Sequence, residues 1–451
     1  MTIYQNYYRD TFTNPLMQEI FSEESRFKSW LKTEASLAKV QSELGLIPKK
    51  ASENISKMAK VKNLDLCKLK EQYKDTGFPI LPLVTQLTSL CDKDSAKWVH
   101  WGATTQDIID TGASIQMKAG LSILEADLVE IANSILDLSE KHRNTVMAGR
   151  TFKQHASPIT FGFKASIWLD EIRRHLERLK HIKKNALLCS YGGAVGNLAA
   201  LGDDGIEVAN KLADDLGLEH SSISWHTSRD GWAELVFWLA LASASLSKIA
   251  SEISTLMSTE INEVREPYKK GRGASSAMPQ KRNPISCPII ISNANRLRDL
   301  LSSQLSAMNQ DHERALAGQS LEWLIIPDAF LLASGVFMHS KEILADLDVD
   351  SNNMLINLKM GGGLIMSEAV KIGLAKKIGR KKAHELVSDA AAKALENNIK
   401  LSEALAQSQE ITSEISEDKM KSLFNASNYL GSTNAMIDQV QARYKNLKSS
   451  G

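Results

Sequence analysis

The sequence predicts an all-α protein built around a bundle of long helices. Apolar residues recur at helical spacing over runs of about thirty residues, whereas an average helix has roughly twelve. Signals for strands are almost absent. We therefore expect the bundle to consist of helices over residues 114–143, 160–188, 232–264, 285–310 and 319–345.

Breaks in this pattern predict three helical domains, over residues 1–100, 101–354 and 355–451. In the first, an apolar helix over 17–44 stops at Gly45, and a more polar helix follows over 50–75. The second is the long-helix bundle. The third begins after the glycine-rich joint at 359–363 and contains shorter amphipathic helices, with a polar tail from 431.

Composition excludes several classes of protein. A chain of 451 residues with 43% hydrophobic residues can build a substantial core. A net charge of +1 gives no electrostatic reason to bind nucleic acid or an anionic membrane. The first residues lack a signal-peptide pattern, and no run of eighteen apolar residues suggests a membrane span.

The cysteines and the remaining motifs indicate a cytoplasmic protein without a metal. Its four cysteines lie far apart and form no C-x-x-C pair, as expected for reduced thiols: Cys67, Cys91, Cys189 and Cys287. The zinc-binding pattern H-E-x-x-H does not occur either, and we expect no metal. The glycine-rich turn over 192–196 is not a G-x-G-x-x-G motif, so we expect close backbone packing there and no cofactor.

A loop over residues 271–284 carries the densest chemistry. Its glycines and prolines prevent a helix, yet it holds two hydroxyls, two cations and an amide, at Ser275, Ser276, Lys281, Arg282 and Asn283. Such a loop is typical of a lid that closes over an anionic substrate. A solvated turn between helices is the alternative.

Three further segments carry candidate site residues. Thr104 and Thr105 begin a helix whose free N–H groups can receive a carboxylate, and His100 can transfer a proton. A polar loop over 149–162 contains Gln154 and His155. Arg314 lies between two long helices, where its guanidinium could clamp a carboxylate. Each has a plainer structural reading, as a helix cap, a backbone contact or a solvated turn.

These segments together resemble the fumarase/aspartase superfamily. The loop matches the signature G-S-S-x-M-P-x-K-x-N-P, with Ala274 in place of the usual second glycine. H-W-G-A-T-T-Q-D over 100–107 resembles its T-[ST]-x-D motif, and G-R-T-x-x-Q over 149–154 its third region. With W-H-T-x-R-D over 225–230, the strings most resemble 3-carboxy-cis,cis-muconate cycloisomerases, a family close to adenylosuccinate lyases.

The resemblance implies an architecture and a mechanism. It implies a homotetramer with a twenty-helix core, whose active sites combine regions from three subunits. It implies that a base removes a proton beside a carboxylate and forms an aci-carboxylate. The base would be Ser276, with Ser275 the alternative, and the acid His155 or His100. The groups that bind substrate would be Thr104, Thr105, Gln154, Lys281, Asn283 and Arg314.

Three departures keep other readings open. Phe152 stands where adenylosuccinate lyases have a histidine linked to acid catalysis, and Asp10-Thr11-Phe12 replaces their arginine-tyrosine pair. Gln280 stands where the cycloisomerase branch has histidine. The chain could therefore be a lyase that eliminates another group on nitrogen, oxygen or sulfur, or a silent helical scaffold that has lost activity.

Overall fold

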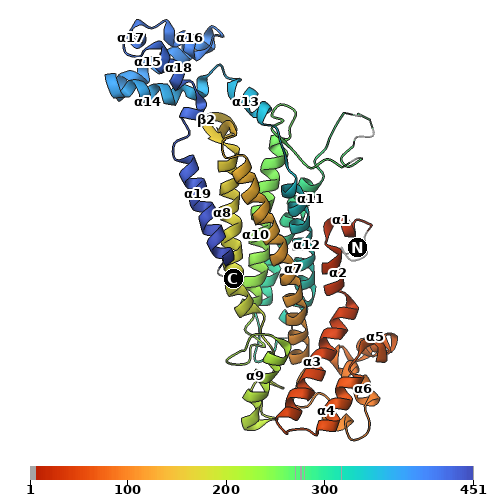
Figure 1. Cartoon of the computed structure of the whole chain (residues 1–451). Helices are drawn as coiled ribbons and strands as arrows, with labels where there is room; N and C mark the ends of the chain where they lie inside the picture. The colour runs from red at the N-terminus through yellow and green to blue at the C-terminus, as the bar shows by residue number, and fades with distance from the viewer. Residues whose placement is uncertain (1–6, 270, 275–276, 279, 316, 450–451) are drawn as a thin grey trace. The chain divides into compact units, whose positions relative to one another are not determined.

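The predicted all-α fold is confirmed in a computed structural model, which describes residues 7–269, 271–274, 277–278, 280–315 and 317–449 (Figure 1). Each long helix expected from the sequence is present. The observed ends lie within a few residues of the expected ones, except that the first helix starts earlier and the third ends earlier than expected. The five are α7 (Thr105–Lys141), α8 (Phe161–Ala186), α10 (Asp230–Leu256), α11 (Ser286–Ala307) and α12 (Gly318–Ala345).

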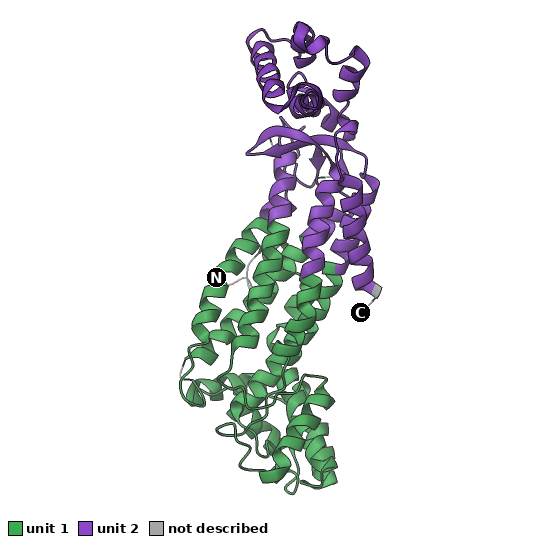
Figure 2. Ribbon diagram, turned by 90° about the vertical axis from the view of Figure 1, so that its left-hand side faces the viewer, with its two compact units in different colours: residues 1–128, 175–247, 289–339 green, residues 129–174, 248–288, 340–451 purple. Residues whose placement is uncertain are grey.

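The chain forms two compact units (Figure 2). Unit 1 contains residues 1–128, 175–247 and 289–339, and unit 2 contains 129–174, 248–288 and 340–451. Every long helix contributes one segment to each unit. These units are defined by compactness in space, whereas the three predicted domains are defined by breaks along the sequence. The three-domain division therefore stays a prediction.

Unit 1 adds a group of shorter helices to its segments of the bundle. The helix expected over 17–44 is in fact two helices, because the Ser22 side chain accepts a hydrogen bond from Ser25 N–H and starts a new helix. The helix expected over 50–75 is also divided. The elements are α1 (Arg9–Phe12), α2 (Pro15–Ile20), α3 (Glu23–Glu43), α4 (Lys49–Met58), η2 (Val61–Asn63), α5 (Leu66–Thr76), α6 (Ile80–Leu90), η3 (Ala96–Trp98), η4 (Gly202–Asp204) and α9 (Gly205–Leu216).

Unit 2 contains a β-hairpin where the sequence predicted a polar loop. Strands β1 (Val146–Thr151) and β2 (Gln154–Thr160) pair antiparallel. Phe152 and Lys153 form the connection with φ of 50° and 63°, the left-handed pair of a type I′ turn. The prediction of a loop was wrong because neither turn residue is the glycine or asparagine that usually marks such a turn.

Unit 2 also contains a second short strand pair, β3 (Val264–Arg265) with β4 (Asp348–Val349). The amphipathic helices expected near the C-terminus are present and share a core centred on Val370, Leu374 and Ala383. The elements are α13 (Ser351–Lys359), η5 (Leu364–Met366), α14 (Ser367–Ile378), α15 (Arg380–Glu396), α16 (Leu401–Ala406), α17 (Gln409–Thr412), α18 (Glu417–Leu423), η6 (Ala426–Asn428) and α19 (Thr433–Ser449).

Two helices, α10 and α12, are long and apolar enough to cross a membrane. Their most apolar windows are 67% and 72% buried within the protein, as in the central helices of a folded core. The cysteines are all free; Cys189 and Cys287 are buried, Cys91 is partly buried and Cys67 is exposed.

Candidate active site

Asp107 organises the start of α7 in unit 1. One carboxylate oxygen accepts a hydrogen bond from Thr104 N–H at 3.0 Å and another from Gly193 N–H at 3.0 Å. The other oxygen accepts from Gly192 N–H at 2.9 Å and from His226 Nε2 at 2.7 Å. This buried carboxylate therefore joins the helix N-terminus to the glycine-rich turn and to the segment before α10.

The glycine-rich turn approaches the residues before α7 closely, as predicted. Gly193 has φ of +74°, and a Cβ atom there would lie 3.1 Å from the Gly102 carbonyl oxygen. Gly102 has φ of +73°, and its Cβ would lie 2.8 Å from the Tyr191 hydroxyl. Side chains at either position would separate the two segments, so the glycines permit this contact.

Arg314 lies beside Thr104, as expected of two groups that would receive the same carboxylate. Its Nη2 donates hydrogen bonds to Thr104 Oγ1 at 2.9 Å and to the Ala194 carbonyl at 3.0 Å. Its buried Nε–H finds no acceptor among the described residues. Thr105 is the first residue of α7, so a cation and a helix N-terminus occur together.

His100 forms an ion pair with a residue that the sequence analysis did not single out. Its Nδ1 lies 2.6 Å from Glu34 Oε1, and the two side chains are 19% and 1% exposed. Burial alone would lower the pKa of His100, but the charge and the hydrogen bond of Glu34 raise it above its ordinary value. With Nδ1–H donated to Glu34, the imidazole is held in one orientation.

A second buried network lies further along α7. Arg229 donates to Asp110 at 2.7 Å and to Glu322 at 2.6 Å, and all three side chains are at most 1% exposed. Gln106 also donates to Asp110, at 3.1 Å. Two carboxylates share one guanidinium here, and burial, opposed by Arg229, raises the pKa of Glu322. This network fixes the first turns of α7 on which Thr104 and Thr105 depend.

In unit 2, the hairpin presents Gln154 and His155. Gln154 is exposed at the start of β2, and His155 pairs with Arg150 on β1. Burial, together with the charge of Arg150, lowers the pKa of His155. Arg150 itself donates to the fully buried Glu263 at 2.6 and 2.9 Å. This buried pair fixes the strand that supports His155.

The signature loop in unit 2 is closed at its neck by Asn283. Its backbone N–H and its side-chain amide both donate to the Gly273 carbonyl, at 3.0 and 3.1 Å. A Cβ atom at Gly273 would lie 2.5 Å from the Asn283 carbonyl oxygen, so only glycine fits there. In this structure Asn283 therefore holds the loop, while the predicted bases Ser275 and Ser276 lie outside the described residues.

The base of the loop is anchored by Glu342. This carboxylate accepts hydrogen bonds from Arg272 at 2.6 and 2.8 Å and pairs with Lys269. Burial opposes its ionisation, but these cations dominate and lower the pKa of Glu342 to about 2. Lys281 is exposed, with no hydrogen bond or ion pair from its side chain to any described residue. Lys281 could therefore contact a substrate if the loop closes as a lid above its anchored neck.

The predicted residues thus fall into two sets. Unit 1 contains His100, Thr104, Thr105 and Arg314, of which Arg314 and Thr104 are in direct contact, whereas unit 2 contains Gln154, His155, Lys281 and Asn283. In the part of the chain that the structure describes, no three His, Cys, Asp or Glu side chains gather as they would around a metal ion.

The sequence analysis missed two kinds of residue. Asp107 and His226 belong to quoted motifs, T-[ST]-x-D and W-H-T-x-R-D, but no role had been assigned to either. Glu34 lies in an ordinary amphipathic helix. Its burial is what sets Glu34 apart from other glutamates, and burial cannot be seen without the fold.

Comparisons with known proteins show the family of this chain. Residues 9–298 match the family model described as "Lyase", and residues 363–440 match "Adenylosuccinate lyase C-terminus". The chain belongs to this lyase family, within the fumarase/aspartase superfamily. It is therefore an enzyme of that superfamily.

Individual relatives are similar over nearly the whole chain. Trans-aconitate decarboxylase 1 of Mycosarcoma maydis is 38% identical, with 96% of this chain and 88% of the relative covered. The 3-carboxy-cis,cis-muconate cycloisomerase of Pseudomonas aeruginosa is 37% identical, with 95% and 94% covered. The solved 3-carboxy-cis,cis-muconate lactonizing enzyme of Pseudomonas putida has a TM-score of 0.94 and 35% identity, with 98% and 99% covered.

Proposed function

We propose that this enzyme is a cycloisomerase that acts on 3-carboxy-cis,cis-muconate in the cytoplasm. The observation that carries the proposal is the hydrogen bond between Arg314 and Thr104 at the N-terminus of α7, since a guanidinium beside a helix N-terminus suits a carboxylate group. The cycloisomerase relatives, similar over most of their length, supply the particular substrate. This substrate carries three carboxylates, and His100 and Arg314 of unit 1 are basic groups that could bind them.

The proposed reaction balances without a cofactor. In the lactone-forming direction, a substrate carboxylate oxygen attacks a carbon of the double bond. The displaced electron pair moves into the carboxylate next to the other carbon, which gives an aci-carboxylate. A proton from the lid serine, Ser276 or Ser275, then goes to that carbon, and the reverse reaction returns it to the serine. Cations and helix N–H groups stabilise the intermediate charge.

The trans-aconitate decarboxylase relative favours a second candidate. Trans-aconitate is also an unsaturated tricarboxylate, so the same cations could bind it. There, the bond to one carboxylate would break, CO2 would leave, and the electron pair would move through the double bond before a carbon is protonated. The two candidates differ in one product, since only decarboxylation releases CO2.

The experiment offers the purified enzyme 3-carboxy-cis,cis-muconate, trans-aconitate and adenylosuccinate separately. Loss of the ultraviolet absorbance of the conjugated diene, without CO2 release, is the expected result with the first. CO2 from trans-aconitate would instead assign the decarboxylase, and fumarate from adenylosuccinate an elimination lyase. No turnover of any of the three would support the inactive scaffold and contradict the proposal.

A further inference from the structure

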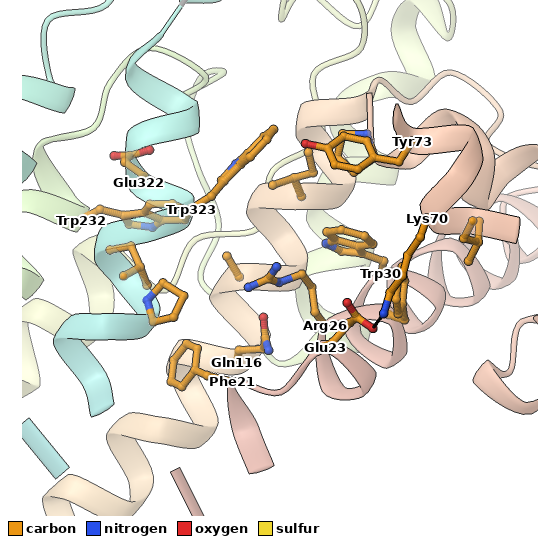
Figure 3. Close-up of a pocket in the computed structure, with 17 residues that line it drawn as sticks. Phe21, Glu23, Arg26, Trp30, Lys70, Tyr73, Gln116, Trp232, Glu322 and Trp323 are labelled. Atoms are coloured by element: carbon orange, nitrogen blue, oxygen red, sulfur yellow. Dashed lines mark ion pairs between the residues drawn. The ribbon is translucent and has the colours of Figure 1, made fainter. Parts of the chain in front are cut away.

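A cavity in unit 1 lies apart from the candidate active site. It has a volume of about 190 Å³ and opens between α3, α5, α7 and α12. Aromatic side chains make much of its wall, among them Phe21, Trp30, Tyr73, Trp232 and Trp323 (Figure 3). Within the described chain, no hydrogen bond or ion pair joins a lining residue to Asp107, Thr104 or Arg314, although Glu322 in the wall belongs to the Arg229 network.

The size and walls of the cavity suit a small ring. An apolar cavity of roughly 150 Å³ in another protein is large enough to bind benzene. The present cavity is somewhat larger and its wall is mostly apolar. Flat indole and phenyl faces stack on a flat ligand more favourably than on an aliphatic chain.

One cation enters this apolar space. Figure 3 shows the Arg26 side chain extending from α3 into the cavity, between Trp30 on one side and Trp232 on the other. Within the described ranges, no hydrogen bond or ion pair from another residue reaches its guanidinium group. A guanidinium near apolar walls gains from an anion that it can bind with two parallel hydrogen bonds.

The acidic residues that line the cavity are already paired. Glu23 forms an ion pair with Lys70 at 2.7 Å. Glu322 directs one oxygen to Arg229 at 2.6 and 2.9 Å and the other to Gln304 at 2.9 Å. Neither carboxylate forms an ion pair with Arg26. Arg26 is therefore the charged group of the cavity wall for which the described residues provide no ion-pair partner.

We propose that this cavity is a second ligand site, which binds a small aromatic carboxylate. The ring lies among the aromatic side chains, and the carboxylate pairs with the Arg26 guanidinium. This site differs from the proposed substrate site in ligand class, since a substrate with three carboxylates would leave two charges against apolar walls.

The test is calorimetric titration of the full-length enzyme with benzoate. Two control ligands are benzamide, which has the ring but no charge, and acetate, which has the charge but no ring. Two variants probe the site: Arg26→Gln removes the cation, and Ala113→Leu fills the cavity without changing charge. Lys28→Gln, on the exposed side of α3, is the matched control, and Arg314→Gln removes the other candidate carboxylate site.

We expect benzoate to bind once per chain, with at least about tenfold weaker affinity for Arg26→Gln. Ala113→Leu should abolish binding, while Lys28→Gln and Arg314→Gln should not alter it. Benzamide and acetate should bind more weakly than benzoate to the unaltered enzyme. Absence of benzoate binding, equal binding of benzamide, or loss of binding only in Arg314→Gln would overturn the proposal.

Discussion

Glu34 shows how one buried carboxylate sets the chemistry of its neighbour. It lies 2.6 Å from His100 and is almost inaccessible to solvent. Because the folded pKa of His100 is raised, the charged pair is complete below the ordinary value of 6.5 and is lost as pH rises through the higher folded value. The imidazole therefore stays protonated further into the neutral range than a free histidine.

We predict that Glu34→Gln lowers the pKa of His100, because the amide keeps the shape of the side chain but removes its charge. The histidine resonances, followed by NMR during a pH titration, measure this directly. The basic limb of the kcat/KM profile should move to lower pH with it. The control is Glu43→Gln, an exposed change on the same helix. An unchanged titration of His100 would contradict the assigned pairing.

At the scale of elements, the loop over 271–284 combines a fixed neck with the candidate base. Gly273 and Asn283 close the neck, and the predicted serines lie between them in the sequence. Losing an acid–base group affects the transition state more than the bound substrate. Losing a cation that binds both the substrate and the charged intermediate weakens substrate binding and also slows the reaction.

We predict that Ser276→Ala lowers kcat by roughly 10²–10⁴-fold with little change in KM. Lys281→Ala should impair kcat and KM together. Steady-state kinetics on the accepted substrate separate the two patterns, with Ser302→Ala, an exchange away from the loop, as the control. Near-normal kcat in both Ser275→Ala and Ser276→Ala would make the serine mechanism wrong, and His100 and His155 would be the next candidates.

The anchor of this loop gives a separate prediction. Glu342→Gln removes the charge that holds Arg272 and Lys269, so the loop should open more often and trypsin should cleave it faster at neutral pH. Glu130→Gln, which removes the exposed pair with the neighbouring Lys341, should leave the rate unchanged. Equal cleavage rates in the two variants would show that Glu342 does not restrain the loop.

Elements with strong local signals could be predicted from the sequence, and others could not. The long helices follow from a period that persists for many turns, and their existence was right throughout. The β-hairpin was missed because Phe152 and Lys153 hide its turn. Thr104 became a candidate through a motif and Arg314 through its place between two helices, whereas Glu34 pairs with His100 across 66 positions of the sequence. Such contacts depend on tertiary packing, which local patterns do not contain.

At the scale of the whole molecule, the long helices expose apolar side chains that a single chain leaves uncovered. Phe237 on α10, Leu305 on α11 and Leu324 on α12 are 49%, 56% and 69% exposed. Burial of such surfaces against other copies would be favourable. On this ground we propose the homotetramer with shared active sites that the resemblance implies.

We predict that light scattering at micromolar concentration gives the mass of four chains. Shared sites can be tested by mixing two inactive variants, Ser276→Ala and His100→Ala, and allowing subunits to exchange. Activity should reappear, because some sites then combine intact regions from different chains. A mixture of Ser276→Ala with Lys281→Ala is the control, since both variants should be impaired and both changes lie in one region. A monomer mass, or no recovery, would contradict the proposal.

The hairpin turn at Phe152 and Lys153 has a practical consequence for protein engineering. A residue other than glycine pays about 1–2 kcal/mol for a left-handed backbone, so Lys153→Gly should raise the melting temperature, while Lys153→Ala should not. Calorimetry of both variants decides this. Phe152 is 99% exposed, and histidine tolerates this conformation better than most residues. The tip is therefore a position where directed evolution could install a new acid at little expense to folding.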